Sequence, residues 1–410
     1  MYTIIALIQN YFQSLMDIIF KQVVRLLRKV LFSFFQPVLI KKRNEIGKRI
    51  INDEKLKQNP NTEGLSILNL TSISNSMGVV ANNSFEYFFI AIPDIYGDQL
   101  EKFKFKKNGE SDSTSKYYTK LSDFLAKSYH FSTEEVYNLI STHAECVAKQ
   151  FLEDVKAGKQ KSNNMMFGVD KILNRGRVLE LHIFVTDYFS YTCMNRIYRH
   201  LKREFPHNNS LQIKTIDDVN RVSPFLCNFG VGGFLSLNYA EKEVYFVGKR
   251  SSTVACPNVW QTSFDETFDL RDRPNLQGAS PNLKTCLERG VKEELGFLIN
   301  EHDFRIETSI LSVIQTEERF EIELFILGHC ILKSISEFKE ILSQMYSAPD
   351  FENENEEIRL IPQENIMSFF ENLYLGGESH TIEALDLWTV FMKVRSMHNL
   401  YTEFIKKVEP

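Results

Sequence analysis

The sequence predicts an α+β protein in which an N-terminal amphipathic helix precedes two regions that each contain helices and strands. Three observations lead to this prediction. The 410 residues are 43% hydrophobic and 25% charged, a composition typical of a folded chain with more than one domain. Hydrophobic residues alternate in some segments and recur every three or four residues in others. Polar stretches containing turn residues separate these segments.

Charge and cysteine usage exclude several classes of protein. Residues 1–50 carry a net charge of +7, which leaves −12 for the rest of a chain whose total is −5. A nucleic-acid-binding domain normally has a basic surface, so we expect no nucleic-acid partner. The six cysteines are scattered, with no C-x-x-C pair and no His at metal-ligand spacing beside them. This usage favours a reducing, cytoplasmic location.

The N-terminal segment has the pattern of a basic amphipathic helix. Between residues 21 and 37, Lys21, Arg25, Arg28 and Lys29 recur at helical spacing, and apolar residues fill the other side. The segment lacks the features of a signal peptide, and the chain has no run of 18 apolar residues, so we expect no spanning helix. Residues 21–35 are predicted to pack on another helix. The alternative is contact with an anionic membrane surface, which would place the protein at the inner face of a membrane.

Residues 67–225 are predicted to form an α+β domain without assigned chemistry, following an N-terminal helical segment at 1–50. The predicted elements in chain order are a linker at 51–66, short strands within 67–104 that include 85–93, helical periodicity at about 117–157, a strand running into a turn at 177–191, and a helix at 192–205.

Charged residues on and before the helix at 192–205 allow two interpretations. Its basic residues Arg196, Arg199, Lys202 and Arg203 fall on one side of the helix. We favour a solvated face, and the alternative is a site for a phosphate or carboxylate. Asp187 is predicted to cap the N-terminus of the helix, although a place in a site is the alternative.

The second half contains a predicted β-hairpin at 229–252 and a helix at 282–299. The glycines at 230, 232 and 233 miss the spacing of phosphate-binding loops and are interpreted as a flexible start to a strand. The helix is predicted to bury a stripe of residues spaced by four and to end at Gly296 in a left-handed cap. Glu293 and Glu294 are predicted to lie off this stripe, which consists of Leu283, Leu287, Val291 and Leu295.

The segment from Arg289 to Phe297 reads RGVKEELGF and resembles the second half of the Nudix box, G-x5-E-x7-R-E-U-x-E-E-x-G-U, where U is a bulky apolar residue. The preceding hairpin and Trp260, the strand at 320–330, and the strand and helix at 356–370 are also similar to that family. The resemblance covers residues 229–375. It implies a Nudix-like α/β/α sandwich with a mixed sheet, which a C-terminal helix at 376–410 would follow.

The resemblance also implies a chemistry. Nudix hydrolases hold divalent cations, Mg²⁺ or Mn²⁺, with glutamates on one helix face, and the cations activate a diphosphate and an attacking water. By position, Glu293 and Glu294 would be metal ligands, and Glu293 and Arg289 would be catalytic, with Arg289 orienting a glutamate. The substrate would be a nucleotide-derived small molecule, a nucleoside diphosphate linked to another group.

The sequence departs from the box at three positions. Gly290 stands where the box has glutamate, and Pro281 and Asn275 stand where it has an earlier glutamate and glycine. If residues 267–281 are an insertion, Glu266 would supply the missing metal ligand, with Asp265 or Asp269 as substitutes. Glu288 points about 100° away from position 289 on a helix and is a poor replacement.

An acidic run lies further along the chain, and we favour a solvated loop for it over a source of a general base. It comprises Asp350, Glu352, Glu354, Glu356 and Glu357.

Two functional hypotheses follow from the sequence. The first is a divergent Mg²⁺-dependent hydrolase of the Nudix type. The second is a Nudix-like module that binds a nucleotide without hydrolysing it and acts as a sensor. An unrelated helix that mimics the motif is the remaining alternative.

Overall fold

The described residues of the computed structural model all lie in one compact unit, residues 59–410. The predicted helix at 21–35 and most of the predicted linker lie outside them, so packing and membrane contact both stay predictions. The described residues are 65–71, 87–108, 116–159, 162–174, 179–213, 215–240, 242–251, 258–272, 281–315, 320–345, 348, 355–366, 368–370, 388 and 391–392.

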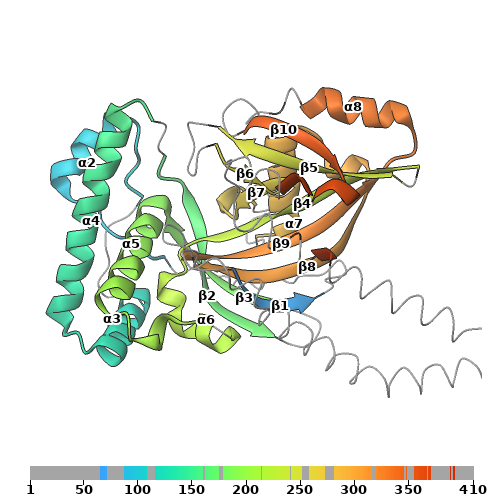
Figure 1. Ribbon diagram of the computed structural model, residues 1–410. Coiled ribbons are helices and arrows are strands. Elements are labelled where there is room, and N and C mark those ends of the chain that lie inside the picture. Colours follow the sequence, from blue (N-terminus) through green and yellow to red (C-terminus); the bar gives the residue numbers. More distant parts are fainter. Residues whose placement is uncertain are drawn as a thin grey trace, which may run out of the picture. The chain divides into compact units, whose positions relative to one another are not determined.

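One mixed sheet contains most of the described strands (Figure 1). Its order is β1-β8-β9-β4-β5-β10, with β6 paired to β5 and β7 paired to β4. The β4–β9 pair is parallel and the other pairs are antiparallel, which confirms the predicted α+β class with a mixed sheet. The strands are β1 (Leu65–Thr71), β4 (Phe229–Tyr239), β5 (Lys242–Arg250), β6 (Trp260–Gln261), β7 (Phe264–Thr267), β8 (Asp303–Gln315), β9 (Phe320–Ile331) and β10 (Asn355–Pro362).

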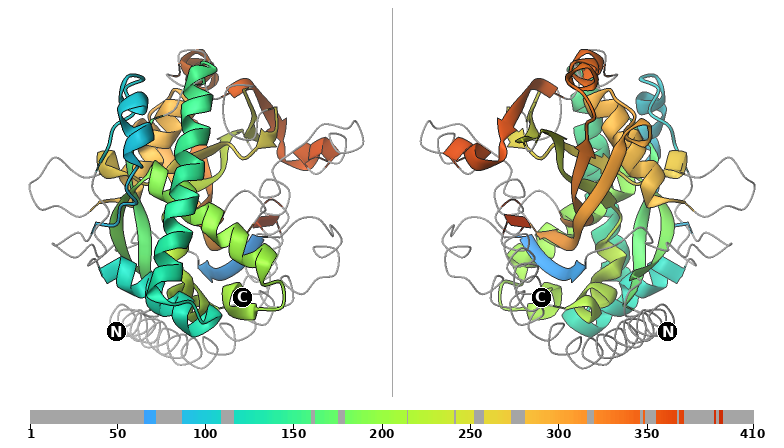
Figure 2. Two further views of the ribbon diagram at one scale, coloured as in Figure 1. Left: turned by 90° about the vertical axis from the view of Figure 1, so that its left-hand side faces the viewer. Right: turned by 90° about the vertical axis from the view of Figure 1, so that its right-hand side faces the viewer.

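A second, two-stranded sheet and a group of helices come from the first half of the chain. The hairpin consists of β2 (Met165–Asn174) and β3 (Leu179–Asp187). The long helix α4 packs against α2 and α5, and Figure 2 shows α4 as the longest helix of this group. The helices here are α2 (Asp94–Glu101), α3 (Lys116–Tyr129), α4 (Thr133–Lys156), α5 (Tyr188–Glu204) and α6 (Ile216–Val222).

The helical periodicity predicted at 117–157 corresponds to two helices, α3 and α4. The break falls at His130, whose φ of 61° lies in the left-handed region that ends a helix. A capping box then starts α4, because the Ser132 hydroxyl accepts from the Glu135 amide and the Glu135 carboxylate accepts from the Ser132 amide. The period alone did not reveal this break.

The predicted strand at 85–93 is wrong. Among its described residues, pairing is limited to one bridge between Tyr87 and Val185, and the Phe88 amide donates to the Val185 carbonyl at 2.9 Å. Phe88, Ile90 and Ile92 are all buried, so the alternation reflects side chains that enter the core without strand pairing.

Helix α5 begins earlier than the sequence predicts, at Tyr188, so β3 is shorter than the predicted strand at 177–191. The predicted cap is confirmed, because the Asp187 carboxylate accepts from the Ser190 amide at 2.8 Å.

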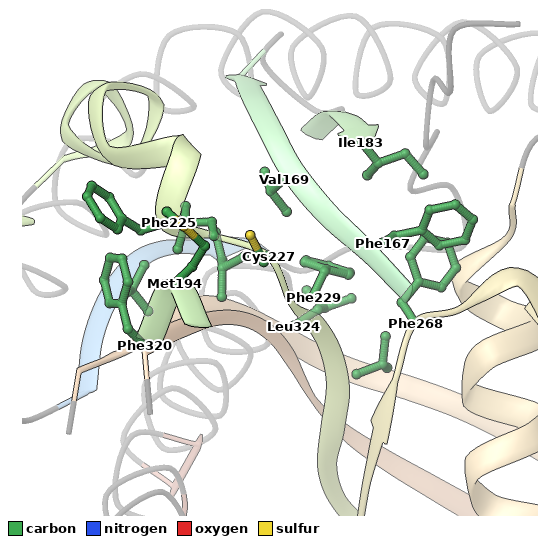
Figure 3. Packing of buried hydrophobic residues seen from close by; sticks show 14 of the residues in the cluster. Phe167, Val169, Ile183, Met194, Phe225, Cys227, Phe229, Phe268, Phe320 and Leu324 are labelled. Carbon is green, nitrogen blue, oxygen red and sulfur yellow. The ribbon is translucent and has the colours of Figure 1, made fainter. Parts of the chain in front are cut away.

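One hydrophobic core joins elements from both predicted regions (Figure 3). The Phe167 ring of β2 lies 5.0 Å from the Phe268 ring, and the Tyr198 ring of α5 stacks on Phe320 of β9 at 3.9 Å. Strand β1 also joins the sheet whose other strands all follow residue 228. The division predicted between regions 67–225 and 229–375 stays a prediction.

The predicted hairpin is confirmed as β4 and β5. Residues 236–239 of β4 pair with residues 242–245 of β5, and the turn contains Ala240. Gly233 is essential to β4, because its φ is 147° and an added Cβ would lie 2.0 Å from the Ile326 carbonyl oxygen. Of the predicted C-terminal helix at 376–410, the structure describes Trp388, Phe391 and Met392, all helical.

Two further observations concern the described residues only. None of the helices among them is both long and apolar enough to cross a membrane. The cysteines that the structure describes are free thiols, namely Cys146, Cys193, Cys227, Cys286 and Cys330.

A largely buried histidine, with 12% of its side chain exposed, links four strands of the sheet. His329 Nε2 lies 2.6 Å from Glu307, and its Nδ1 lies 2.8 Å from Glu243 and 2.7 Å from the Ser236 hydroxyl. Burial alone would lower the pKa of His329, but its hydrogen bonds to the two carboxylates and their charge raise the pKa above its ordinary value.

We expect His329 to make the free energy of unfolding depend on pH. Since its pKa is higher in the folded chain, its stabilisation is complete below about pH 6.5, the ordinary pKa, and is lost as the pH rises through the folded value. Urea denaturation from pH 6 to 9 should show the stability difference between wild type and His329→Gln shrinking with pH. A difference that stays constant, or the same trend for the exposed His207→Gln, would contradict this role.

Candidate functional site

Strand β7 and the helix α7 (Leu283–Gly290) bring Glu266 and the box-like segment together. β7 pairs with β4, and α7 lies over β7. A Cβ added at Gly290 would lie 2.8 Å from the Glu266 Cβ and 3.3 Å from its Cγ. The Glu266 side chain therefore occupies the space that a side chain at position 290 would need. The glycine that departs from the box is what allows this close approach.

The end of the helix differs from the prediction in one respect. After Gly290 the chain continues as a π-helical turn, Val291–Leu295, which ends at Gly296 with φ 80°, the predicted left-handed cap. The predicted apolar stripe is buried, but Glu294 is also buried, with 2% of its surface exposed. Its Oε1 accepts from the Asp265 amide of β7 at 2.8 Å. The prediction that Glu294 lies off the buried stripe is thus wrong, because Glu294 follows Leu287 by seven residues and Val291 by three, spacings that place all three side chains on one helix face.

Arg289 lies among four carboxylates, of which Asp269 is the most distant, at 3.8 Å from Nη2. Its Nε and Nη2 donate to the two oxygens of Asp272, each at 2.9 Å, in a bidentate pair. Its Nη1 lies 2.7 Å from Glu266 and 3.2 Å from Glu293, and its Nη2 also donates to the Thr267 carbonyl at 2.7 Å. Only 11% of the side chain is exposed, so these contacts hold a largely desolvated charge.

A short 3-10 helix, Leu270–Asp272, adds residues that the sequence did not predict for the site. The Asp272 carboxylate is fully buried and accepts from the Asp269 amide at 2.9 Å. Arg271 pairs with Asp269 at 2.7 Å and with Glu293 at 3.3 Å. The signal was an acidic pair three residues apart with arginine between them, in a loop that sequence reasoning treated as an insertion.

The electrostatics of Glu266 follow from this arrangement. Burial raises the pKa of Glu266, Arg289 opposes the rise, and the Glu293 carboxylate adds to it. Burial alone would lower the pKa of Arg289, but its hydrogen bonds to Asp272 and the charge of Glu266 raise it, so the guanidinium stays charged.

The residues match a divalent cation in the kind of ligand they offer. Carboxylate oxygens are what Mg²⁺ prefers, and Glu266 and Glu293 both lie within hydrogen-bond distance of one nitrogen, Arg289 Nη1. Across the part of the chain that the structure describes, no group of three His, Cys, Asp or Glu residues is spaced to hold a metal ion. A cation would therefore have to displace Nη1 from at least one of these two carboxylates.

Three of the other acids considered from the sequence are described by the structure, and none of their described contacts is with this cluster. Glu288 forms an ion pair with Lys284 at 3.6 Å, and Glu357 accepts from Arg359 at 2.6 Å on β10. Glu356 is exposed. Asp350, Glu352 and Glu354 lie outside the described residues.

Comparisons with known proteins give weak matches. No family model matches the chain, and no curated protein matches it. Solved structures that resemble it include an Ap4A hydrolase from C. elegans, at 12% identity and a TM-score of 0.25 over 40% of this chain and 98% of that one. RenU, a Nudix hydrolase from M. smegmatis, shares 8% identity at a TM-score of 0.26, over 41% of this chain and 86% of that one. The Nudix domain of Shewanella oneidensis NrtR, complexed with ADP-ribose, shares 8% identity at a TM-score of 0.25, over 40% of this chain and 86% of that one. Likeness this low carries no argument about function, which must come from the contacts described above.

We expect Asp272 to be the main support of Arg289. Asp272→Asn removes a fully buried charge from a bidentate pair and should lower the free energy of unfolding by about 3 kcal/mol. Arg271→Gln is the matched control, because that side chain is 54% exposed and its removal should cost less than about 1 kcal/mol. Urea denaturation measures both. Equal effects of the two variants would contradict the assignment.

Proposed function

We propose that this chain is a divergent Nudix-type hydrolase that uses Mg²⁺ or Mn²⁺ to cleave a nucleoside diphosphate linked to another group. The observation that carries the proposal is the position of Glu266. Its side chain fills the space over Gly290 and contacts the same Arg289 nitrogen as Glu293, so a carboxylate from β7 would supply what the helix lacks. An ADP-ribose-like molecule is the substrate class that we would test first.

The residues of the cluster would divide the work as follows. Once Arg289 Nη1 leaves Glu266 or Glu293, these two residues and Glu294 would hold the cation, which when bound would polarise the diphosphate and lower the pKa of the attacking water. Arg289 keeps Glu266 and Glu293 close together through its contacts with both carboxylates. Asp272 fixes Arg289 in turn, because its two oxygens accept from two different guanidinium nitrogens.

A second candidate is a module that binds a nucleotide without hydrolysing it. The observation that favours it is that Arg289 and Arg271 already pair with the carboxylates that would bind the cation. Such pairing weakens cation binding, and each lost contact to a cation reduces transition-state stabilisation.

Turnover separates the two candidates. Purified protein with Mg²⁺ or Mn²⁺ should hydrolyse a member of a panel of ADP-ribose, dinucleoside polyphosphates and NAD(H), and Glu294→Gln should reduce the rate by about 100-fold or more. Lys284→Gln on the exposed side of α7 should leave the rate unchanged and serves as control. Thermal stabilisation by a panel member without turnover would support the binding module instead. If no panel member is hydrolysed and none stabilises the protein, both candidates are excluded.

Exchanging the two side chains tests whether Glu266 replaces the glutamate missing at position 290. Glu266→Gly should lower the rate of hydrolysis, because one carboxylate is lost. Adding Gly290→Glu should recover part of the rate, because glycine at 266 removes the Cβ that a side chain at position 290 would meet at 2.8 Å. Gly290→Glu alone should lower the rate, since its Cβ meets the Cβ of Glu266. A double variant no faster than Glu266→Gly would contradict the replacement.

Membrane association and a cytoplasmic location are proposals that rest on the sequence alone. They rest on the basic amphipathic pattern of residues 21–35 and on the scattered cysteines.

A further inference from the structure

The turn that follows α2 presents an aromatic ring and three lysines at the surface. Residues 102–107, the α2 turn, read KFKFKK. Phe103 is 43% exposed, and the lysines near it are exposed as well, namely Lys102, Lys104 and Lys106. None of these three lysines forms an ion pair among the residues whose positions are described. A single exposed ring is common on proteins, but one surrounded by lysines without opposite charges requires an explanation.

Lys104 occupies a backbone position that usually belongs to glycine. Its φ is 63°, in the left-handed region, where residues with a Cβ are strained. The two hydrogen bonds of a Schellman motif end α2 here. The Lys104 amide donates to the Glu101 carbonyl at 2.9 Å, and the Phe105 amide donates to the Leu100 carbonyl at 3.2 Å. Because strained positions of this kind concentrate at functional sites, the charge at position 104 is a candidate for a functional group.

The α2 turn is fixed to the rest of the protein on its inner side. Helix α2 lies beside α4 (Figure 2). The Phe105 ring is buried and lies 5.4 Å from the Phe151 ring of α4. The Lys106 carbonyl accepts from Asn163 Nδ2 at 2.9 Å. Phe103 therefore stands on an anchored turn, so little conformational entropy is lost when a partner covers it.

The charge of the α2 turn is opposite to that of the surrounding sequence. Residues 101–107 contain four lysines and one glutamate, a net charge of +3, whereas residues 51–410 have a net charge of −12. The fourth lysine, Lys107, lies 3.9 Å from Asp98 of α2. Its charge is thus directed back to the helix, and the other three lysines are left for an anionic partner.

We propose that the α2 turn contacts an anionic membrane surface, with Phe103 entering the headgroup region and the three exposed lysines contacting lipid phosphates. An aromatic ring is stabilised at the boundary between headgroups and acyl chains, and each lysine near the surface is attracted to anionic lipids. This contact is separate from the amphipathic segment at 21–35 and does not depend on the hydrolase proposal.

A membrane fits the α2 turn better than a nucleic acid. Proteins that bind single strands stack successive bases on several aromatic rings along a basic groove. The α2 turn offers one ring, because Phe105 points into the core and only Phe103 is exposed. Stable attachment to a membrane normally takes two signals, and the basic amphipathic pattern of residues 21–35 would supply the second.

Fluorescence of the full chain carrying Phe103→Trp tests insertion directly. The two native tryptophans, Trp260 and Trp388, are fully buried and supply a constant background. Vesicles of phosphatidylcholine and phosphatidylserine should shift the added emission to the blue, and brominated acyl chains should quench it, whereas the wild type should show neither change. Absence of quenching, or a response to a single-stranded oligonucleotide but not to vesicles, would overturn the proposal.

Co-sedimentation with the same vesicles measures the contribution of the lysines. Lys106→Gln should weaken binding about fivefold, because one charge near the lipid surface is lost. Lys127→Gln is the matched control and should leave binding unchanged. It makes the same charge change at an exposed position of α3, near the start of α4, and the α2 turn lies near the other end of that helix, which is about 36 Å long. Equal binding by wild type and Lys106→Gln would contradict the proposal.

Lys104→Gly separates membrane binding from folding. Glycine relieves the left-handed strain, so the midpoint of urea denaturation should stay the same or rise. Vesicle binding should nevertheless fall about fivefold, because a lysine is removed from the α2 turn. A variant that binds vesicles as tightly as the wild type would overturn the role of Lys104, and a lower denaturation midpoint would overturn the argument from strain.

Discussion

The candidate site depends on one guanidinium group removed from water. Arg289 lies on α7, yet its partners come from β7, from the 3-10 helix that follows β7, and from the π-helical turn. A charge that is mostly buried is strongly destabilising unless carboxylates surround it. Burying Arg289 therefore fixes the positions of Glu266, Asp272 and Glu293 at the same time. The arrangement of the carboxylates and the stability of this part of the fold therefore depend on the same contacts.

The glycine at position 290 gives that arrangement its particular form. A glutamate there would project toward β7 and collide with the Glu266 side chain. Because glycine has no side chain, the helix approaches the strand closely and Glu266 reaches Arg289 at 2.7 Å. A substitution that weakens the helix by about 1 kcal/mol in isolation is thus tied to a contact between two elements. The close approach of α7 to β7 and the contact between Glu266 and Arg289 are parts of one packing arrangement.

Local signals in the sequence predicted local structure well. The cap at Asp187, the end of the helix at Gly296, the hairpin and the buried stripe of α7 each depend on a few neighbouring residues. Contacts between distant elements were harder to foresee. Asp272 lies 17 residues before Arg289, and nothing in the spacing indicates that they meet. The burial of Glu294, in contrast, is compatible with the helical period, because Glu294 follows Leu287 by seven residues, about two turns of the helix.

A cation would compete with the Arg289 guanidinium for the carboxylates, and the free-energy cost of separating a carboxylate from Arg289 differs from one residue to the next. Asp272 is fully buried and bound by two nitrogens, so separating it from Arg289 would be expensive. Glu293 is the most exposed of the acids around Arg289, at 24%, and exposed ion pairs contribute about 0–1 kcal/mol. Arg289 would keep Asp272 and the Thr267 carbonyl if Glu293 turned away. The cluster therefore opposes a cation least at Glu293, one of the two residues that the box motif assigns to the metal, and the two proposed functions, hydrolysis and binding without hydrolysis, would differ in this single balance.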